Sequence, residues 1–208
     1  GRFLTETLPR SLDMRAARVH GPLPMDYDAI ILGGGAAGLF SAGIAGQRGR
    51  RVLVVEKAEA VGRKILISGG GRCNFTNLGA GPANFLSANP HFAKSALARY
   101  TSRDFLALVE RYGIAWHEKT LGQLFCDGSA KQIVAMLLAE CEKGGVEVRT
   151  AQEIASVARN DEGFLVTANG ETHRAPSLVI ATGGPSIPKM GASGIAYDLA
   201  RQFGMKVV

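Results

Sequence analysis

A glycine-rich turn early in the chain has the spacing of a phosphate-binding loop. Gly33, Gly35 and Gly38 form the pattern GxGxxG, with Ala36 and Ala37 inside it. In such a loop the first glycine permits a tight turn, the second lets the backbone approach a pyrophosphate, and the third lets the helix pack on the strand. The helix N-terminus then offers free N–H groups and partial positive charge to the phosphates. The pattern predicts a site for the ADP half of a dinucleotide.

Glu56 stands where an acidic side chain usually binds the ribose of such a cofactor. It directly follows the apolar run 52–55, about 20 residues beyond the glycine turn. An acid at this position disfavours a 2′-phosphate, so NADP is not expected here. The competing interpretation is a glycine-rich packing turn followed by a surface glutamate.

A second glycine-rich segment, residues 62–77, combines bare backbone with three cations and several neutral hydrogen-bonding groups. Successive N–H groups in such a loop can form an anion-binding nest. Arg63, Lys64 and Arg72 could balance the charge of a diphosphate. Cys73 is either a buried packing thiol or a group near a reacting ring. The side chains that could bond the edge of a polar ring are Ser68, Asn74, Thr76 and Asn77. A flexible surface loop is the alternative interpretation.

A third motif follows the apolar run 178–180. There the chain reads Ala181, Thr182, Gly183 and Gly184. Many strands end in glycine, so the motif carries weight only beside the first one. In an open α/β sheet it would bring its turn next to Gly33, at the crevice where ligands bind.

A strand–turn–helix–strand unit must hold these motifs in place. Residues 27–32 are β-prone, 37–47 are small and apolar as in a tightly packed helix, and 52–55 are typical of a strand buried on both faces of a parallel sheet. The other expected elements are an extended loop region at 62–90, helices at 91–100, 103–112, 129–143 and 193–203, strands at 146–149 and 178–181, and a hairpin of 154–158 with 164–168, with Ser102 and Ser129 as helix N-caps.

The predicted fold class is α/β. It is a Rossmann-like domain with a central parallel sheet, flanking helices and a small antiparallel β-meander, over residues 26–208. Residues 1–25 are expected to be a disordered extension, with an organelle transit peptide as the less favoured alternative.

Composition limits the function classes. The 208 residues suffice for one sizeable core, and the net charge of +6 suits an anionic ligand. Because no Lys/Arg block with interleaved aromatics occurs, we expect a small-molecule substrate and no nucleic-acid partner. No apolar run reaches the length of a membrane span, so no membrane partner is expected either. Three cysteines without a CxxC favour a reducing, cytoplasmic location. Four dispersed histidines give no metal site, and oligomeric state stays open.

The combination of motifs resembles the FAD flavoproteins of the glutathione-reductase-like, two-dinucleotide-binding superfamily. Within it, residues 64–77 (KILISGGGRCNFTN) are similar to the hallmark of a bacterial family of NAD(P)/FAD-dependent oxidoreductases, the aminoacetone-oxidase-like flavoproteins. Residues 181–188 with 191–194 resemble its second signature. The resemblance covers about residues 26–208, and the 64–77 motif is its specific part.

The resemblance implies a set of FAD-binding residues. The glycine turn would hold the diphosphate, Glu56 with Lys57 the adenosine ribose, and the backbone of Glu153 or Ile154 the adenine. The second segment would wrap the diphosphate and reach toward the flavin. The full set is Gly33, Gly35, Ala36, Ala37, Gly38, Glu56, Lys57, Arg63, Lys64, Ser68, Gly69, Gly70, Gly71, Arg72, Cys73, Asn74, Thr76, Ile154, Ala181, Thr182 and Gly183.

The expected function is that of an FAD-dependent oxidoreductase that passes a hydride through FAD, with NAD(P)H as a candidate reductant. Substrate and catalytic residues stay unassigned. A plain NAD-dependent dehydrogenase would explain the first motif but leave the other two without a purpose. A non-catalytic FAD-binding module is the third hypothesis. The resemblance also implies that family members continue into a substrate domain and a closing FAD segment, so the chain is expected to be an N-terminal part that lacks full activity alone.

Overall fold

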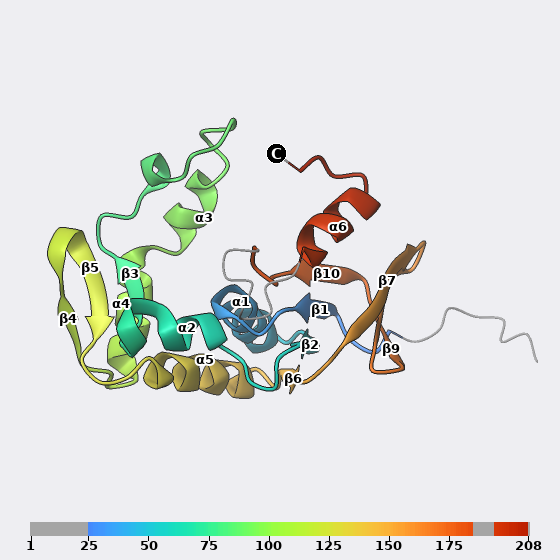
Figure 1. Ribbon diagram of the computed structural model, residues 1–208, viewed down its shortest axis with the longest axis horizontal. Coiled ribbons are helices and arrows are strands. Elements are labelled where there is room, and N and C mark those ends of the chain that lie inside the picture. The colour runs from blue at the N-terminus through green and yellow to red at the C-terminus, as the bar shows by residue number, and fades with distance from the viewer. Residues whose placement is uncertain (1–24, 185–193, 208) are drawn as a thin grey trace, which may run out of the picture.

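The computed structural model describes residues 25–184 and 194–207, and its centre is a four-stranded parallel sheet (Figure 1). The strand order is β10-β1-β2-β6. Strand β1 pairs in register with its neighbours on both sides, so Ile31 lies between Val54 and Val179. The bounds are β1 Ala29–Leu32, β2 Val52–Val55, β6 Glu147–Arg149 and β10 Ser177–Ile180.

Two helices cover one face of this sheet. They are α1 (Ala36–Gln47) and α5 (Lys131–Lys143). Because successive side chains of a strand point to opposite faces, Ile31, Val52 and Val54 share this face and join the helices in one apolar core. All three are almost fully buried, so the helices close this face over β1 and β2.

An antiparallel β-meander and one helix cover the other face. Leu32, Leu53 and Val55 pack there against meander residues such as Val166, and Leu199 of the helix joins them. Both faces of β2 are therefore buried, as the apolar run predicted. The covering elements are β7 Ile154–Asn160, β8 Gly163–Ala168, β9 Glu171–Ala175 and α6 Ile195–Gln202.

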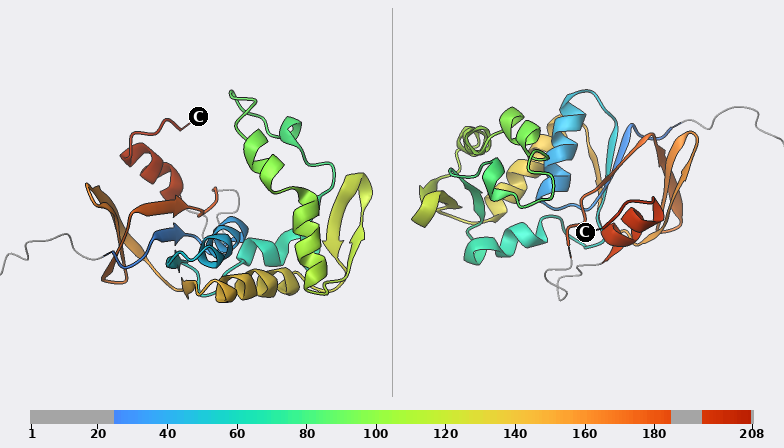
Figure 2. Two further views of the ribbon diagram at one scale, coloured as in Figure 1. Left: turned by 180° about the vertical axis from the view of Figure 1, so that it is seen from behind. Right: turned by 90° about the horizontal axis from the view of Figure 1, so that it is seen from above.

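A second layer of elements extends from the α1 side of the sheet (Figure 2). A three-stranded antiparallel sheet, ordered β3-β5-β4, lies there with short helices around it. The strands are β3 Asn74–Asn77, β4 Trp116–Glu118 and β5 Gln123–Cys126; the helices are α2 Arg63–Ile67, α3 Lys94–Arg99 and α4 Ser102–Arg111, with 3₁₀ turns η1 Ser68–Gly71, η2 Pro82–Asn84 and η3 Thr120–Gly122. No helix within the described ranges is long and apolar enough to cross a membrane.

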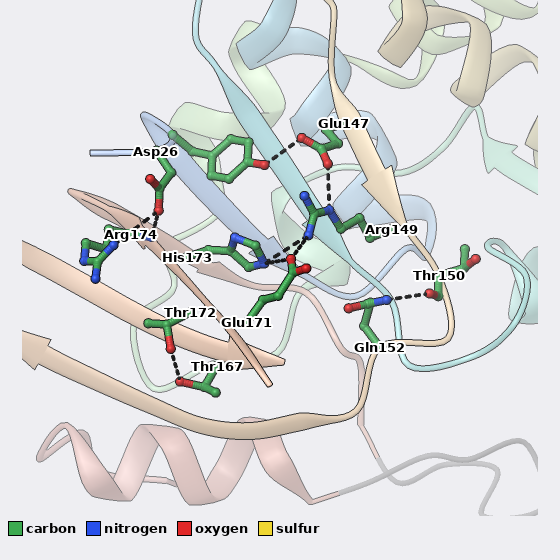
Figure 3. Close-up of polar contacts among 11 residues, drawn as sticks. Asp26, Glu147, Arg149, Thr150, Gln152, Thr167, Glu171, Thr172, His173 and Arg174 are labelled. Atoms are coloured by element: carbon green, nitrogen blue, oxygen red, sulfur yellow. Dashed lines mark hydrogen bonds and ion pairs between the residues drawn. The ribbon is translucent and has the colours of Figure 1, made fainter. Parts of the chain in front are cut away.

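An ion-pair network ties the meander to the edge of the parallel sheet (Figure 3). Arg149 on β6 donates to Glu147 and to Glu171 of β9, each at 2.6 Å. Tyr27, just before β1, donates to Glu147 at 2.6 Å, and its ring meets that of the buried His173 edge-on. Burial, together with the hydrogen bond to this carboxylate, raises the pKa of Tyr27 to about 12. The network therefore links β9 of the meander to β6 and to the segment that precedes β1.

The fold class and most elements agree with the sequence prediction. Four details were wrong. Residues 62–90 hold α2 and β3, whose pairing with β5 is non-local. Strand β9 was missed, because its buried positions are His173 and Ala175 and not large apolar residues. Strand β10 is an edge strand with Val179 38% exposed, so it is not buried as expected.

The fourth detail concerns helix caps. Thr101, not Ser102, caps α4: its Oγ1 accepts from the N–H of Asp104, whose carboxylate accepts the Thr101 N–H in return. The N-cap of α5 is Ala130, although the Ser129 Oγ still accepts from the Lys131 N–H. The last helix begins at Ile195, and its expected start at residue 193 lies outside the described residues.

Glycines let α1 and α5 approach backbone to backbone. A Cβ on Gly46 would lie 2.6 Å from the carbonyl oxygen of Gly144 and 2.7 Å from Val146. We expect Gly46→Val to lower the free energy of unfolding by about 1–3 kcal/mol, since the helices must separate. Urea denaturation measures this, with Ala135→Val on the exposed side of α5 as the matched control. Equal losses in both variants would contradict the close-packing argument.

Glu140 on α5 is a hydrogen-bond hub at the same helix contact. Its carboxylate accepts from Tyr112 at 2.5 Å, Lys143 at 2.7 Å and Gln47 at 3.0 Å. Burial by itself would raise the pKa of Glu140, but the hydrogen bonds from Lys143, Tyr112 and Gln47 outweigh it and lower the pKa to about 2.

This lowered pKa predicts a pH-dependent contribution to stability. The ionised carboxylate stabilises the fold above the unfolded-state value of 4.5, and that contribution is lost as the pH falls from there toward about 2. We therefore expect Glu140→Gln to be less stable than wild type at pH 6 and closer to it at pH 3. Denaturation at both pH values tests this, with the exposed Glu142→Gln as control. A stability gap that does not change with pH would refute the assignment.

Candidate functional site

The glycine turn between β1 and α1 is shaped by backbone contacts. Gly33 has φ +106°, and a Cβ on it would lie 2.6 Å from the carbonyl oxygen of Ala181. A Cβ on Gly38 would collide with the carbonyl oxygen of Gly33. Gly35 differs, because a Cβ on it would meet no atom within 4 Å. The backbone packing thus requires glycine at Gly33 and Gly38, whereas Gly35 faces open space at the start of α1.

Glu56 turns its carboxylate toward this loop. One oxygen accepts from the N–H of Gly34 at 2.6 Å and the other from the N–H of Ala58 at 2.7 Å. Since a carboxylate offers about four lone-pair sites, it can still accept hydroxyl donors. These bonds hold the side chain at the end of β2, where the sequence motif placed it.

A small recess lies beside Glu56, at the carboxyl ends of β1, β2 and β10. Its volume is about 140 Å³, and Thr182 contributes a buried Oγ1 without a hydrogen-bond partner within the described part of the chain. Lys57 and Glu153 pair at 3.1 Å across its exposed side. Both backbone polar groups of Glu153, one of the two residues expected at the adenine, bond to Asn169. The other, Ile154, also lines the recess. The lining residues are Gly33, Val55, Glu56, Lys57, Glu153, Ile154, Thr182 and Ile195.

The segment 62–77 folds beside the glycine turn rather than forming a loose loop. Gly69 and Gly70 adopt left-handed backbone conformations, as does Cys73 at φ 55°. The N–H groups of Arg72 and Cys73 bond back to carbonyls of the same turn, so these two do not contribute to an anion nest. Lys64 donates to the carbonyl of Gly184 at 3.2 Å and so links this segment to the third motif.

A larger cavity of about 830 Å³ opens on the other side of the α1 N-terminus. Ala36 and Ala37 form one wall, and Ser68, Cys73, Asn74 and Thr76 form part of another. Five aromatic rings complete the apolar part of the lining, and nothing in the sequence predicted that they would meet: Phe40, Phe75, Phe85, Tyr100 and Phe105. The rings come from separate parts of the chain, and Phe40, Phe75 and Phe105 also pack on the main core. Because these rings lie far apart in the sequence, no local signal could have identified the cavity.

The three cysteines are buried and free. Burial raises the pKa of the Cys73 thiol, and raises those of Cys126 and Cys141 to about 11. Cys73 borders the larger cavity but belongs to the apolar core, which favours the packing role among the two that the sequence left open.

A comparison with protein families matches the HI0933-like protein Rossmann domain over residues 27–208. The chain belongs to this family. It is a Rossmann family that binds FAD, within the FAD-dependent oxidoreductase superfamily, as the three glycine motifs indicated.

Several proteins are similar in sequence. The chain is 59% identical over 182 residues to the ribosomal RNA dihydrouridine synthase of Escherichia coli, covering 88% of this chain and 46% of that protein. It is 51% identical to the protein of that name from Haemophilus influenzae, over 86% and 46% of the two chains. A 3-dehydro-bile acid delta(4,6)-reductase of Clostridium scindens is 30% identical, over 84% and 43%. The chain therefore spans just under half the length of these relatives.

Solved structures share the fold at low sequence identity. A 3-ketosteroid-delta4-(5alpha)-dehydrogenase from Rhodococcus jostii superposes with a TM-score of 0.58 at 18% identity, over 82% of this chain and 48% of that one. This likeness confirms the α/β fold with its parallel central sheet.

The residues present fit FAD. The open space at Gly35 leaves room for a diphosphate against the α1 N-terminus, and the unpartnered Thr182 Oγ1 lies in the recess that Glu56 borders. Glu56 would hold the ribose, Ile154 would lie against the adenine, and Ser68, Asn74 and Thr76 would line the flavin side. When bound, FAD supplies the redox chemistry, and the chain's own groups bind and orient it.

Substitutions at two glycines separate cofactor binding from folding. We expect Gly35→Val to fold normally but to lose FAD affinity by more than about tenfold, because the new side chain fills the diphosphate space. Gly33→Ala should instead destabilise the fold by about 1–3 kcal/mol, because it strains a left-handed residue against Ala181. Flavin fluorescence titration and thermal melting measure the two effects. Unchanged FAD affinity in Gly35→Val would refute the placement of the diphosphate.

Proposed function

We propose that the full-length protein is an FAD-dependent reductase of uridine in ribosomal RNA. The observation that carries this proposal is the 59% identity with the ribosomal RNA dihydrouridine synthase of Escherichia coli, which extends over 88% of this chain. The sequence alone favoured a small-molecule substrate. The name of the two most similar relatives described above favours RNA instead.

The larger cavity supports a planar substrate. It begins at the α1 N-terminus and is lined by Phe40, Phe75 and Phe105, whose rings suit an aromatic base. Asn74 and Thr76 add polar groups that could bond the edge of a base. An enzyme that acts on a base of folded RNA must draw that base out of its stack into such a pocket.

The chemistry balances as a two-electron reduction. The C5=C6 double bond of the uracil ring would accept a hydride at one carbon and a proton at the other, which gives dihydrouridine. FAD, held by the glycine turn and Glu56, would supply this hydride, and NADH or NADPH would supply the two electrons overall. The cavity walls would hold the base and exclude water from it.

A small-molecule reductase is the second candidate. The bile-acid reductase of Clostridium scindens is 30% identical to this chain, and the cavity lining is largely apolar, as an alicyclic substrate requires. The amine oxidation suggested by the sequence resemblance belongs to the same class of small-molecule chemistry, but it would consume oxygen instead of NAD(P)H.

The test uses the full-length protein in a strain that lacks its gene. We expect dihydrouridine to be absent from the ribosomal RNA of that strain and restored by the wild-type gene, as measured by mass spectrometry of nucleoside digests. Gly35→Val, which removes the cofactor space, is the matched control and should not restore it. Purified protein with FAD and NADH or NADPH should form dihydrouridine in RNA from the deletion strain. Unchanged dihydrouridine in that strain would refute the proposal, and flavin oxidation by a steroid enone alone would support the second candidate.

A further inference from the structure

Residues 60–103 form a stretch without acidic side chains. This segment contains Arg63, Lys64, Arg72, Lys94, Arg99 and Arg103, and no Asp or Glu. The formal charge of the segment equals the net charge of the whole chain, so the remaining residues balance to zero. Such segregation of positive charge is the electrostatic footprint expected of a surface that binds a polyanion.

The second half of this segment projects from the body of the molecule. Figures 1 and 2 show α3 and the loop before it standing away from the parallel sheet. Every residue from 82 to 92 is exposed. Among them Leu86 is 98% exposed, and the rings of Phe85 and Phe92 meet edge-on at 6.4 Å between centroids.

The projecting part also borders the larger cavity. Phe85 and Lys94 line it, as do residues 100–102, which Arg99 and Arg103 flank. Within the described ranges, Lys94, Arg99 and Arg103 are exposed and form no ion pair with a carboxylate. Cations without carboxylate partners and exposed rings thus surround one rim of the cavity.

We propose that this rim, residues 82–103, is the RNA-binding surface that delivers the substrate base to the cavity. The proposal rests on the proposed function above and adds the place of contact. The side chains of Lys94, Arg99 and Arg103 bind the RNA phosphates. No acidic residue of the same segment competes with the phosphates for these cations. Phe85 and Phe92 stack on unpaired bases, as exposed rings do in proteins that bind single-stranded RNA. Asp104 is the first acidic residue after the rim, and its carboxylate already accepts hydrogen bonds from the N–H and the hydroxyl of Thr101, the N-cap of α4.

Charge reversal tests the phosphate contacts. In the full-length, FAD-loaded protein, Arg99→Glu/Arg103→Glu should weaken binding of a fluorescein-labelled single-stranded oligouridylate by about tenfold or more at 100 mM salt. The slope of log Kd against log salt should fall by about 1.4, since each lost contact to a single strand contributes about 0.7. The matched control is Arg48→Glu/Arg159→Glu, which changes the net charge by the same amount. Both residues are exposed: Arg48 is the C-cap of α1, and Arg159 lies on β7.

Ring removal tests the base contacts separately. Phe85→Ala/Phe92→Ala should reduce oligouridylate affinity by about fivefold or more while the salt slope stays the same, because stacking releases no counterions. Flavin absorbance and melting temperature, measured on each variant, establish that it is folded and loaded.

The outcomes separate this proposal from the proposed function. If the wild-type protein binds RNA and the Arg99/Arg103 variant loses no more affinity than the control, the rim proposal is overturned while the proposed function stands. If the wild-type protein leaves ribosomal RNA unmodified, the proposed function fails, and the rim proposal that rests on it fails too. If the rim variants lose both oligouridylate binding and in-cell dihydrouridine while the Arg48/Arg159 control keeps both, the rim is supported as the delivery surface.

Discussion

The close approach of three backbone segments at the end of β1 is the constraint on which the rest of the structure depends. Gly33 touches the carbonyl of Ala181, and Gly38 touches the carbonyl of Gly33, so no side chain larger than hydrogen fits at either place. This contact sets the N-terminus of α1 directly against the ends of two parallel strands. It also leaves the space at Gly35 open between two hollows, the recess at Glu56 and the aromatic cavity.

The two hollows are lined by elements that cover different faces of the parallel sheet. The recess depends on the meander and α6, because Ile154 and Ile195 form part of its wall. The cavity depends on the helical side, where residues of α1, α4 and α5 meet the 62–77 segment. An extended dinucleotide lying across the glycine turn would therefore have its adenosine end on one side of the sheet edge and its reactive end on the other. The ion-pair network at Arg149 and Glu171 keeps the first side in place.

The sequence predicted the elements that have a local residue pattern. It could not predict the contacts between residues that lie far apart along the chain. The run 52–55 and the small residues of α1 identified a buried strand and a packed helix, because burial on both faces leaves a continuous apolar pattern. The position of Glu56 followed from spacing alone. Strand β3 could not be predicted in this way, since its partner β5 lies some fifty residues further along and three of its four residues are polar. The cavity was hidden for the same reason: Phe40, Tyr100 and Phe105 converge only through tertiary packing.

The burial of the cysteines affects how readily their thiols are oxidised. Reduced flavins that meet oxygen release hydrogen peroxide, which oxidises thiolates far faster than thiols. Cys73 borders the cavity in which such chemistry would take place. Cys126 lies near Cys73, and burial and then this proximity raise the pKa of Cys126 to about 11. Because burial raises the pKa of both thiols, they stay protonated near neutral pH and would resist peroxide formed in the cavity. Sulfur at these positions adds packing volume and polarisability to the core without adding a reactive thiolate.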